Sequence, residues 1–119
     1  MTRIAVIDDN KDVRKCLGIF LKLLGFKVRE FDSAEKFLIA LNRSLKMDLL
    51  ITDFHLKEMS GWELVKKLQI DFKDTFPIVL ISTDLAAANL AENLEIHFMD
   101  KFRINEDLPT LLQNIFFKG

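Results

Sequence analysis

Short runs of aliphatic and β-branched residues recur along the chain and are separated by longer, mixed stretches. Runs of this kind, bounded by polar or turn residues, are typical of strands. They predict five strands, over residues 4–7, 26–31, 48–52, 78–81 and 96–99. The first and fourth runs contain no polar residue, which is typical of strands that are buried on both faces.

The stretches between these strands have the spacing of amphipathic helices. One face of the first helix would collect five apolar residues: Val13, Leu17, Phe20, Leu21 and Leu24. The second helix would follow Ser33 and place three more on its inner side: Phe37, Leu38 and Leu41. Both helices would therefore cover the sheet with an apolar face.

The other helices are predicted from start signals as much as from spacing. Ser60 and Glu63 form a capping-box pattern, which marks the start of a third helix just beyond the third strand. A fourth helix is expected within the short, alanine-rich stretch 85–94. The fifth is expected over 106–117, with Pro109 in its first turn, where a missing amide hydrogen is tolerated.

Strands and helices thus alternate along the chain. Alternation implies right-handed crossovers, parallel strands and helices on both faces of the sheet. We expect an α/β fold, a doubly wound five-stranded parallel sheet in a three-layer sandwich, with residues 1–119 forming a single domain. In such folds, ligands bind beyond the carboxyl ends of the strands.

The charge balance argues against a partner that is recognised by bulk charge, such as nucleic acid or an anionic membrane. Lys and Arg number 17 against 18 for Asp and Glu, so the formal net charge is −1. The single cysteine, Cys16, excludes an internal disulfide, and its apolar neighbours predict a buried or half-buried thiol. The N-terminal apolar run ends at Asp8, too short for a signal peptide or a membrane helix, so we expect a cytoplasmic protein.

Polar side chains follow four of the predicted strands: Asp8 and Asp9, Asp53, Ser82 and Thr83, and Lys101. Each alone is also an ordinary turn, cap or surface residue, but their joint placement at one edge of the sheet favours a site. Crowded carboxylates repel one another unless a cation offsets their charge, and carboxylate oxygens favour hard ions such as Mg²⁺. An Asp oxygen could attack phosphorus there, while a Lys amine and a hydroxyl hold the phosphoryl oxygens.

The strand-end motifs resemble those of the receiver domains of two-component response regulators, which have a flavodoxin-like (βα)5 fold. The resemblance spans nearly the whole chain and rests on four segments: Val6-Ile7-Asp8-Asp9-Asn10, Leu49 to Asp53 with Ser60-Gly61 following, Pro77 to Ser82, and Lys101-Phe102. It implies phosphorelay signalling in which the chain catalyses only its own phosphorylation and dephosphorylation. Such a domain is a switch rather than a turnover enzyme.

The resemblance also implies a role for each residue of the site. Asp53 would be the phosphoacceptor and Lys101 would pair with the phosphoryl group. Mg²⁺, or Mn²⁺, would be held directly by Asp9, mainly through water by Asp8, and by the backbone carbonyl of His55 together with Asp53. The same positions therefore serve metal binding and phosphoryl transfer.

Further positions resemble the switch and the tuning sites of the family. Ser82 would be the switch hydroxyl, and Phe98 the aromatic that changes rotamer with it. His55, Thr83 and Asp84 would tune the lifetime of the phosphoryl group. The implied phosphodonor is a histidine kinase or a phosphotransfer protein, and the implied target is a downstream protein or an output domain. Homodimerisation through the fourth helix, fifth strand and fifth helix would be a further possibility, without direct binding of nucleic acid.

The chain departs from the family pattern at several positions. Lys57 replaces a proline often found after the acceptor, and Phe102 replaces the proline that usually follows the lysine. We expect a trans Lys101–Phe102 bond, since a cis bond without proline costs about 2.5–4 kcal/mol, and a trans bond could shift the Lys101 amine. Thr83 replaces a smaller residue and should slow the entry of water and small phosphodonors. The stretch before the fifth strand lacks the usual Gly-Ala pair, which leaves the fourth helix uncertain.

Two other functions remain open at this point. A metal-dependent phosphohydrolase would also use Asp53 as a nucleophile, but His55 stands where a second acid is expected and the chain has no room for a cap domain. The stronger alternative is a degenerate receiver that binds a partner independently of phosphorylation. Phe102 and Thr83 favour that alternative, whereas the retained acidic and basic residues favour phosphorylation.

Overall fold

The computed structural model describes residues 2–72 and 75–117, and the strands and helices alternate as predicted. The strands are β1 (Arg3–Ile7), β2 (Lys27–Phe31), β3 (Leu49–Asp53), β4 (Ile78–Ser82) and β5 (His97–Asp100). The helices are α1 (Lys11–Leu23), α2 (Ala34–Asn42), α3 (Gly61–Asp71), α4 (Ala87–Asn93) and α5 (Ile104–Phe116), with a 3-10 turn, η1 (Lys101–Arg103), before the last. Ser60 and Glu63 form the capping box that was predicted for α3.

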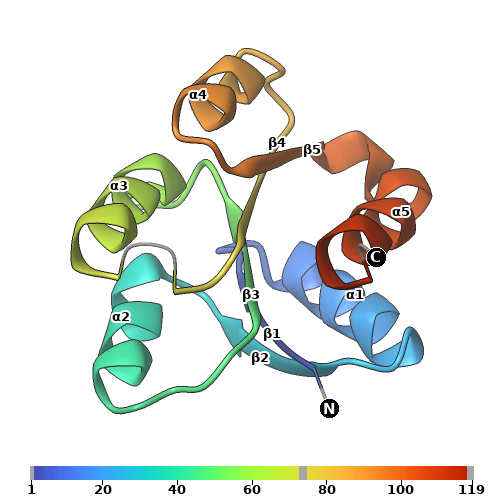
Figure 1. The fold of residues 1–119 in the computed structure, drawn as a ribbon, viewed down its shortest axis with the longest axis horizontal. Helices are drawn as coiled ribbons and strands as arrows, with labels where there is room; N and C mark the ends of the chain where they lie inside the picture. The colour runs from blue at the N-terminus through green and yellow to red at the C-terminus, as the bar shows by residue number, and fades with distance from the viewer. Residues whose placement is uncertain (1, 73–74, 118–119) are drawn as a thin grey trace.

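The five strands form one parallel sheet in the order β2-β1-β3-β4-β5, which confirms the doubly wound α/β fold. The winding direction reverses at β1, because β2 lies on one side of it and β3 on the other. Figure 1 shows α1 and α5 together on one side of the sheet and α2, α3 and α4 on the other. The carboxyl ends of β1 and β3 are therefore neighbours at the switch point, where such folds bind ligands.

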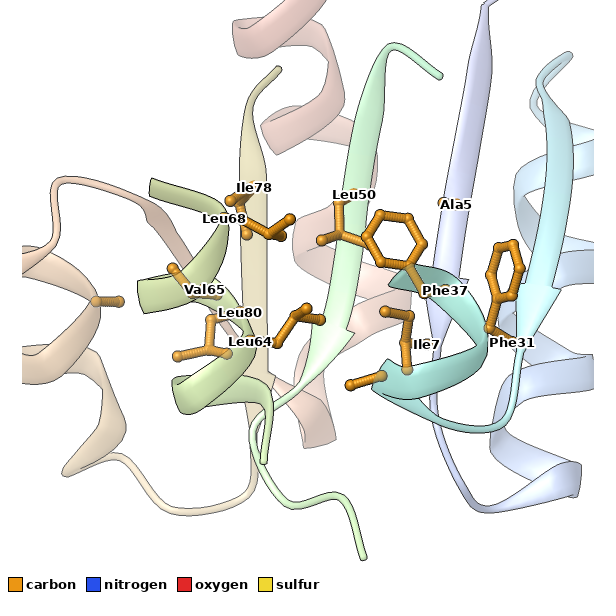
Figure 2. Packing of buried hydrophobic residues seen from close by; sticks show 12 residues of the cluster. Ala5, Ile7, Phe31, Phe37, Leu50, Leu64, Val65, Leu68, Ile78 and Leu80 are labelled. Carbon is orange, nitrogen blue, oxygen red and sulfur yellow. The ribbon is translucent and has the colours of Figure 1, made fainter. Parts of the chain in front are cut away.

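Two hydrophobic clusters hold these layers together, one on each face of the sheet. The first joins β1, β3 and β4 to α2 and α3 through residues such as Phe37, Leu50 and Leu64 (Figure 2). The second packs Leu17 and Leu21 of α1 and two leucines of α5 against the opposite face. Because alternate strand residues point to opposite faces, β1 and β3 contribute to both clusters, and their continuous apolar runs follow from that position.

The start of α5 differs from the prediction. The helix begins at Ile104, two residues earlier than expected, so Pro109 lies in its second turn instead of its first. A proline there leaves the carbonyl of Asn105 without its helical partner, but Asn105 is exposed and its carbonyl can be hydrated. The turn η1 and the i,i+4 pair of Arg103 with Asp107 extend the helical geometry upstream of the predicted start.

Two predictions about α1 were wrong. Cys16 is exposed, because Leu17, Gly18 and Leu21 form the buried face and Cys16 lies beside it. Leu24 is 43% exposed, since it follows the last helical residue and no longer faces the sheet. Within the described ranges, no helix is long and apolar enough to cross a bilayer.

Candidate functional site

The strand order brings the predicted polar residues to one edge of the sheet. Asp8 directly follows β1, Asp53 ends β3, Ser82 ends β4 and Lys101 directly follows β5. Asp8, Asp53 and Ser82 are all buried, at 0%, 4% and 0% exposure. Burying polar and charged side chains lowers stability unless they have partners. Their concentration at this edge of the sheet marks it as the candidate site.

Three carboxylates converge there. Asp8, Asp9 and Asp53 each offer an oxygen atom, and these atoms all lie within 4.8 Å of one another. One oxygen of Asp8, Oδ1, accepts a hydrogen bond from the amide of Asn10 at 2.9 Å, whereas the contact of the buried Oδ2 is the ammonium group of Lys101, 2.9 Å away. Three anionic oxygen donors that converge in this way fit a hard divalent cation such as Mg²⁺ or Mn²⁺.

Lys101 supplies the positive charge on the other side of this cluster. Its Nζ lies 2.8 Å from Oδ2 of Asp53, to which it donates a hydrogen bond, and 2.9 Å from Oδ2 of Asp8. With three carboxylates and one ammonium, the formal charge of the site is −2, the charge that one divalent cation offsets.

The geometry around Lys101 explains how the site is formed without the family's proline. The described peptide bonds are all trans, as expected for Lys101–Phe102. The trans bond does not shift the Lys101 amine away from Asp53, because the carboxylate of Asp100 accepts a hydrogen bond from the amide of Phe102 at 3.0 Å. This cap starts the turn η1 directly after β5 and directs the lysine back over the sheet edge.

Burial and charge act on both members of the central ion pair. Burial raises the pKa of Asp53 above its usual value of 3.8, and the neighbouring charge of Asp8 adds to the rise, while Lys101 opposes it. Burial alone would lower the pKa of Lys101, but its bonds to Asp53 and Asp8 outweigh burial, so its pKa is raised above 10.5. Lys101 therefore stays charged at neutral pH and holds two carboxylates together.

The loop after β3 is tied closely to the acceptor carboxylate. The amide of His55 donates to Oδ1 of Asp53 at 3.3 Å, and the amide of Gly61 donates to the carbonyl of Phe54 at 2.9 Å. Gly61 is necessary here because a Cβ atom would overlap the carbonyl oxygen of Asp53 and lie 2.9 Å from its carbonyl carbon. The start of α3 thus lies directly against the backbone of Asp53.

Two residues that sequence reasoning missed support the same loop. The hydroxyl of Thr52, which is fully buried, donates to the carbonyl of Asp53 at 3.1 Å. The carboxylate of Glu35 in α2 accepts a hydrogen bond from the amide of Met59 at 3.1 Å. The role of Thr52 could have been suspected, because it is a polar residue inside an otherwise apolar strand. The contact of Glu35 joins residues 24 positions apart and leaves no local signal in the sequence.

The hydroxyl hydrogen of Ser82 is free to form a hydrogen bond with a ligand. Its Oγ accepts a hydrogen bond from the amide of Asp84 at 2.9 Å and donates to no described residue. Asp84 in turn accepts from the amide of Ala86 at 2.9 Å, which forms the turn into α4. Thr83 and Asp84 are both exposed, so their side chains lie at the mouth of the site rather than in it.

Two of the predicted residues lie away from the carboxylates. Phe98 is half-buried, pairs in register with Leu80 and packs against the hydrophobic cluster under α2, α3 and α4. The side chain of His55 is exposed and its ring lies 4.8 Å from that of Phe54, so only its backbone is turned toward Asp53. Any action of these two side chains on the site is therefore indirect.

Comparison with known families identifies the arrangement. The family model of the response regulator receiver domain matches residues 4–115. The chain belongs to this family. Receiver domains act in two-component phosphorelay signalling and are not conventional enzymes, which confirms the resemblance inferred from the strand-end motifs.

Several named proteins are similar to this receiver domain. The chemotaxis protein CheY1 of Helicobacter pylori (strain J99) is 31% identical over 96 residues, which cover 78% of this chain and 77% of CheY1. The transcriptional regulatory protein FixJ of Rhizobium meliloti (strain 1021) is 38% identical over 77 residues, which cover 65% of this chain but only 37% of FixJ. The receiver domain thus corresponds to less than half the length of FixJ.

Solved structures of other receivers have the same fold. A response regulator receiver protein from Pseudomonas putida superimposes with a TM-score of 0.80 at 26% identity, covering 99% of this chain and 97% of that one. The response regulator TrrA of Thermotoga maritima, solved in complex with Mg²⁺-BeF, gives a TM-score of 0.85 at 24% identity, covering 97% and 99%. This chain and the two solved structures thus share the five-stranded sandwich.

Proposed function

We propose that this receiver domain takes up a phosphoryl group on Asp53 in a reaction that depends on Mg²⁺ or Mn²⁺, and that the modification switches a surface for binding a partner. The observation that carries the proposal is the position of the Lys101 amine, 2.8 Å from Asp53 and 2.9 Å from Asp8. A half-buried lysine that joins two carboxylates is placed to pair with a phosphoryl oxygen once Asp53 is phosphorylated.

The chemistry assigned to the chain is one phosphoryl transfer. A carboxylate oxygen of Asp53 forms a bond to phosphorus, while the bond from phosphorus to the imidazole nitrogen of the donor breaks. Asp8, Asp9, Asp53 and the backbone carbonyl of His55 would hold the metal, which supplies positive charge at the phosphoryl oxygens when bound. Lys101 and the hydroxyl of Ser82 would take the remaining oxygens, and Ser82 has a free donor for that purpose.

The switch would run from Ser82 to the face formed by α4, β5 and α5. Movement of the Ser82 hydroxyl toward a phosphoryl oxygen would give up the hydrogen bond from Asp84, which starts the turn into α4. Phe98 is half-buried on β5, so a rotamer change there would alter packing and surface together. α4 has only 7 residues and no side-chain N-cap, so its own ends do little to fix it.

The partners follow from this chemistry. The donor would be a histidine kinase or a phosphotransfer protein, and the target a downstream protein, an output domain or a second copy bound through the switched face. The contact of Lys101 with Asp53 favours phosphorylation over a degenerate, constitutively binding receiver, because the departure at Phe102 leaves the amine in place.

Phosphoramidate, a small phosphodonor with a phosphorus–nitrogen bond, tests the proposal directly. We expect intact-mass spectrometry to show the gain of one phosphoryl group in the presence of Mg²⁺, and none after addition of EDTA. The variant Asp53→Asn should stay unmodified while keeping the fold. Modification of Asp53→Asn to the same extent as the native chain would overturn the assignment of the acceptor.

Substitution of Thr83 should change the lifetime of the phosphoryl group. Thr83 is exposed beside the buried Ser82, where its methyl group would narrow access to the acceptor. We expect Thr83→Ala to lose phosphate severalfold faster, measured as release of inorganic phosphate from the phosphorylated protein. The exposed Thr110 of α5 offers a matched control, Thr110→Ala, and an equal acceleration in both variants would contradict the prediction.

A further inference from the structure

A second charged region lies at the other end of the sheet, along β2 and α2. A groove of about 990 Å³ opens there, between the edge strand and the helix, and continues to the loop before β3. Figure 1 shows β2 at the margin of the sheet beside α2. None of the residues placed at the phosphoacceptor site lines this groove.

The groove is strongly basic although the chain as a whole is nearly neutral. Seven of its seventeen lining residues are Lys or Arg, and the one acidic residue is Glu30. The carboxylate of Glu30 is already paired with Arg14 and Lys15 of α1. Five of the cations form no ion pair within the described ranges: Lys22, Lys27, Arg29, Arg43 and Lys46. Unpaired cations that gather in one groove attract an anionic ligand.

The floor of the groove is an unpaired strand edge. β2 pairs with β1 on one side only. The amide of Lys27 donates to Thr2 and the carbonyl of Phe31 accepts from Asp8, so these backbone groups face β1. Because successive residues of a strand direct their backbone groups to opposite sides, those of Val28 and Glu30 face the open edge. Such an edge is a template for another extended chain.

The side chains above this edge are arranged for alternate residues of an added strand. Lys27 and Arg29 lie on the same face of β2 as Phe31, whose ring packs against Phe37 of α2. Lys36 of α2 and Arg43, the C-cap of that helix, flank Ile39, which is 53% exposed. An extended peptide along β2 would therefore meet cations at alternate positions, with an apolar contact beside them.

We propose that this groove binds an acidic, extended peptide segment of a partner protein, which adds to the sheet at the edge of β2. Charge complementarity supplies the attraction, and the backbone of Val28 and Glu30 supplies strand pairing. A nucleic acid would satisfy the cations but would leave the strand edge unpaired and Ile39 without an apolar partner. An acidic peptide would pair with the cations, with the strand edge and with Ile39 together, so the groove fits a peptide better than a nucleic acid.

The test uses a fluorescein-labelled peptide of alternating Glu and Val, blocked at both ends, and fluorescence anisotropy with the full chain. We expect saturable binding that weakens with salt, and no binding of the matching Lys-Val peptide. A Glu-Val peptide with proline at alternate positions keeps charge but loses amide donors, so it should bind at least about tenfold more weakly. In ¹⁵N NMR spectra, the amides of Val28 and Glu30 should shift most.

Charge reversal locates the site. We expect Lys27→Glu combined with Lys46→Glu to weaken peptide binding by about tenfold or more, since both side chains are exposed and unpaired. Lys66→Glu on α3 is the matched control and should leave binding unchanged. Both variants should still bind beryllofluoride with Mg²⁺, which separates this proposal from the phosphorylation switch. Absence of peptide binding, equal binding of the proline peptide, or tighter binding of a poly-dT oligonucleotide would each overturn the proposal.

Discussion

Gly61→Ala is expected to lower the free energy of unfolding by on the order of 3 kcal/mol and to abolish binding of phosphoryl analogues. The added methyl group would overlap the carbonyl oxygen of Asp53 and lie 3.1 Å from Cα of Phe54. Both are backbone atoms, so no side-chain rotation relieves the overlap. The loop must move away from β3, which breaks the bond from Gly61 to Phe54 and displaces the acceptor itself. Urea denaturation measures the first effect and calorimetry with beryllofluoride the second.

The control for Gly61 is the other buried glycine of a helix, Gly18. Its added Cβ would meet Oε2 of Glu30 at 3.0 Å, the end of a side chain that needs to shift by only a few tenths of an ångström. Alanine is also the better helix former by about 1 kcal/mol, so Gly18→Ala should be nearly neutral or stabilising. Equal stability of the two alanine variants would show that the start of α3 is not held against Asp53.

Lys101→Met should destabilise the metal-free protein by about 3 kcal/mol at neutral pH, because it leaves two buried carboxylates without a counter-charge. Asp53, whose pKa is already raised by burial, loses the charge that opposes this rise, so its pKa in the folded state rises further. A carboxyl group with a raised folded pKa stabilises below its unfolded pKa and loses that contribution as the pH increases. The destabilisation should therefore be small near pH 4 and grow above it, as followed by urea denaturation in EDTA.

Magnesium should partly reverse this loss. Without the ammonium the formal charge of the site falls from −2 to −3, so added Mg²⁺ should stabilise Lys101→Met more than the native chain. Lys67→Met serves as the control. Lys67 pairs with Asp71 on the surface, and loss of that ion pair should lower the free energy of unfolding by only about 0.5 kcal/mol. A metal-free Lys101→Met variant as stable as the control would contradict the ion-pair assignment.

The sequence was most informative where local pattern and topology agree. Continuous apolar runs such as Ile4–Ile7 predicted buried parallel strands, and the crossover rule then placed Asp8, Asp53 and Lys101 at one edge. Neither step depends on long-range packing detail. The sequence could therefore predict that Asp8 and Lys101, which are 93 positions apart, belong to one site.

Features that depend on neighbouring elements were not predictable in the same way. Pro109 suggested a helix start because proline favours the first turn, but the cap by Asp100 and the turn η1 start the helical segment earlier. Cys16 has apolar neighbours yet is exposed, since burial depends on the angle of α1 to the sheet. The effect of replacing proline by Phe102 was predicted from the peptide bond alone. The hydrogen bond that Asp100 accepts from the amide of Phe102 is what keeps Lys101 over the site.

Titration calorimetry with beryllofluoride, an analogue of aspartyl phosphate, tests the central claim most directly. The native chain should bind it saturably, with one analogue per chain, in the presence of Mg²⁺ and not in EDTA. The variant Asp53→Ala should keep the fold and lose the binding. Failure of the folded native chain to bind beryllofluoride with Mg²⁺ would contradict the switch and leave the constitutive binding module as the function.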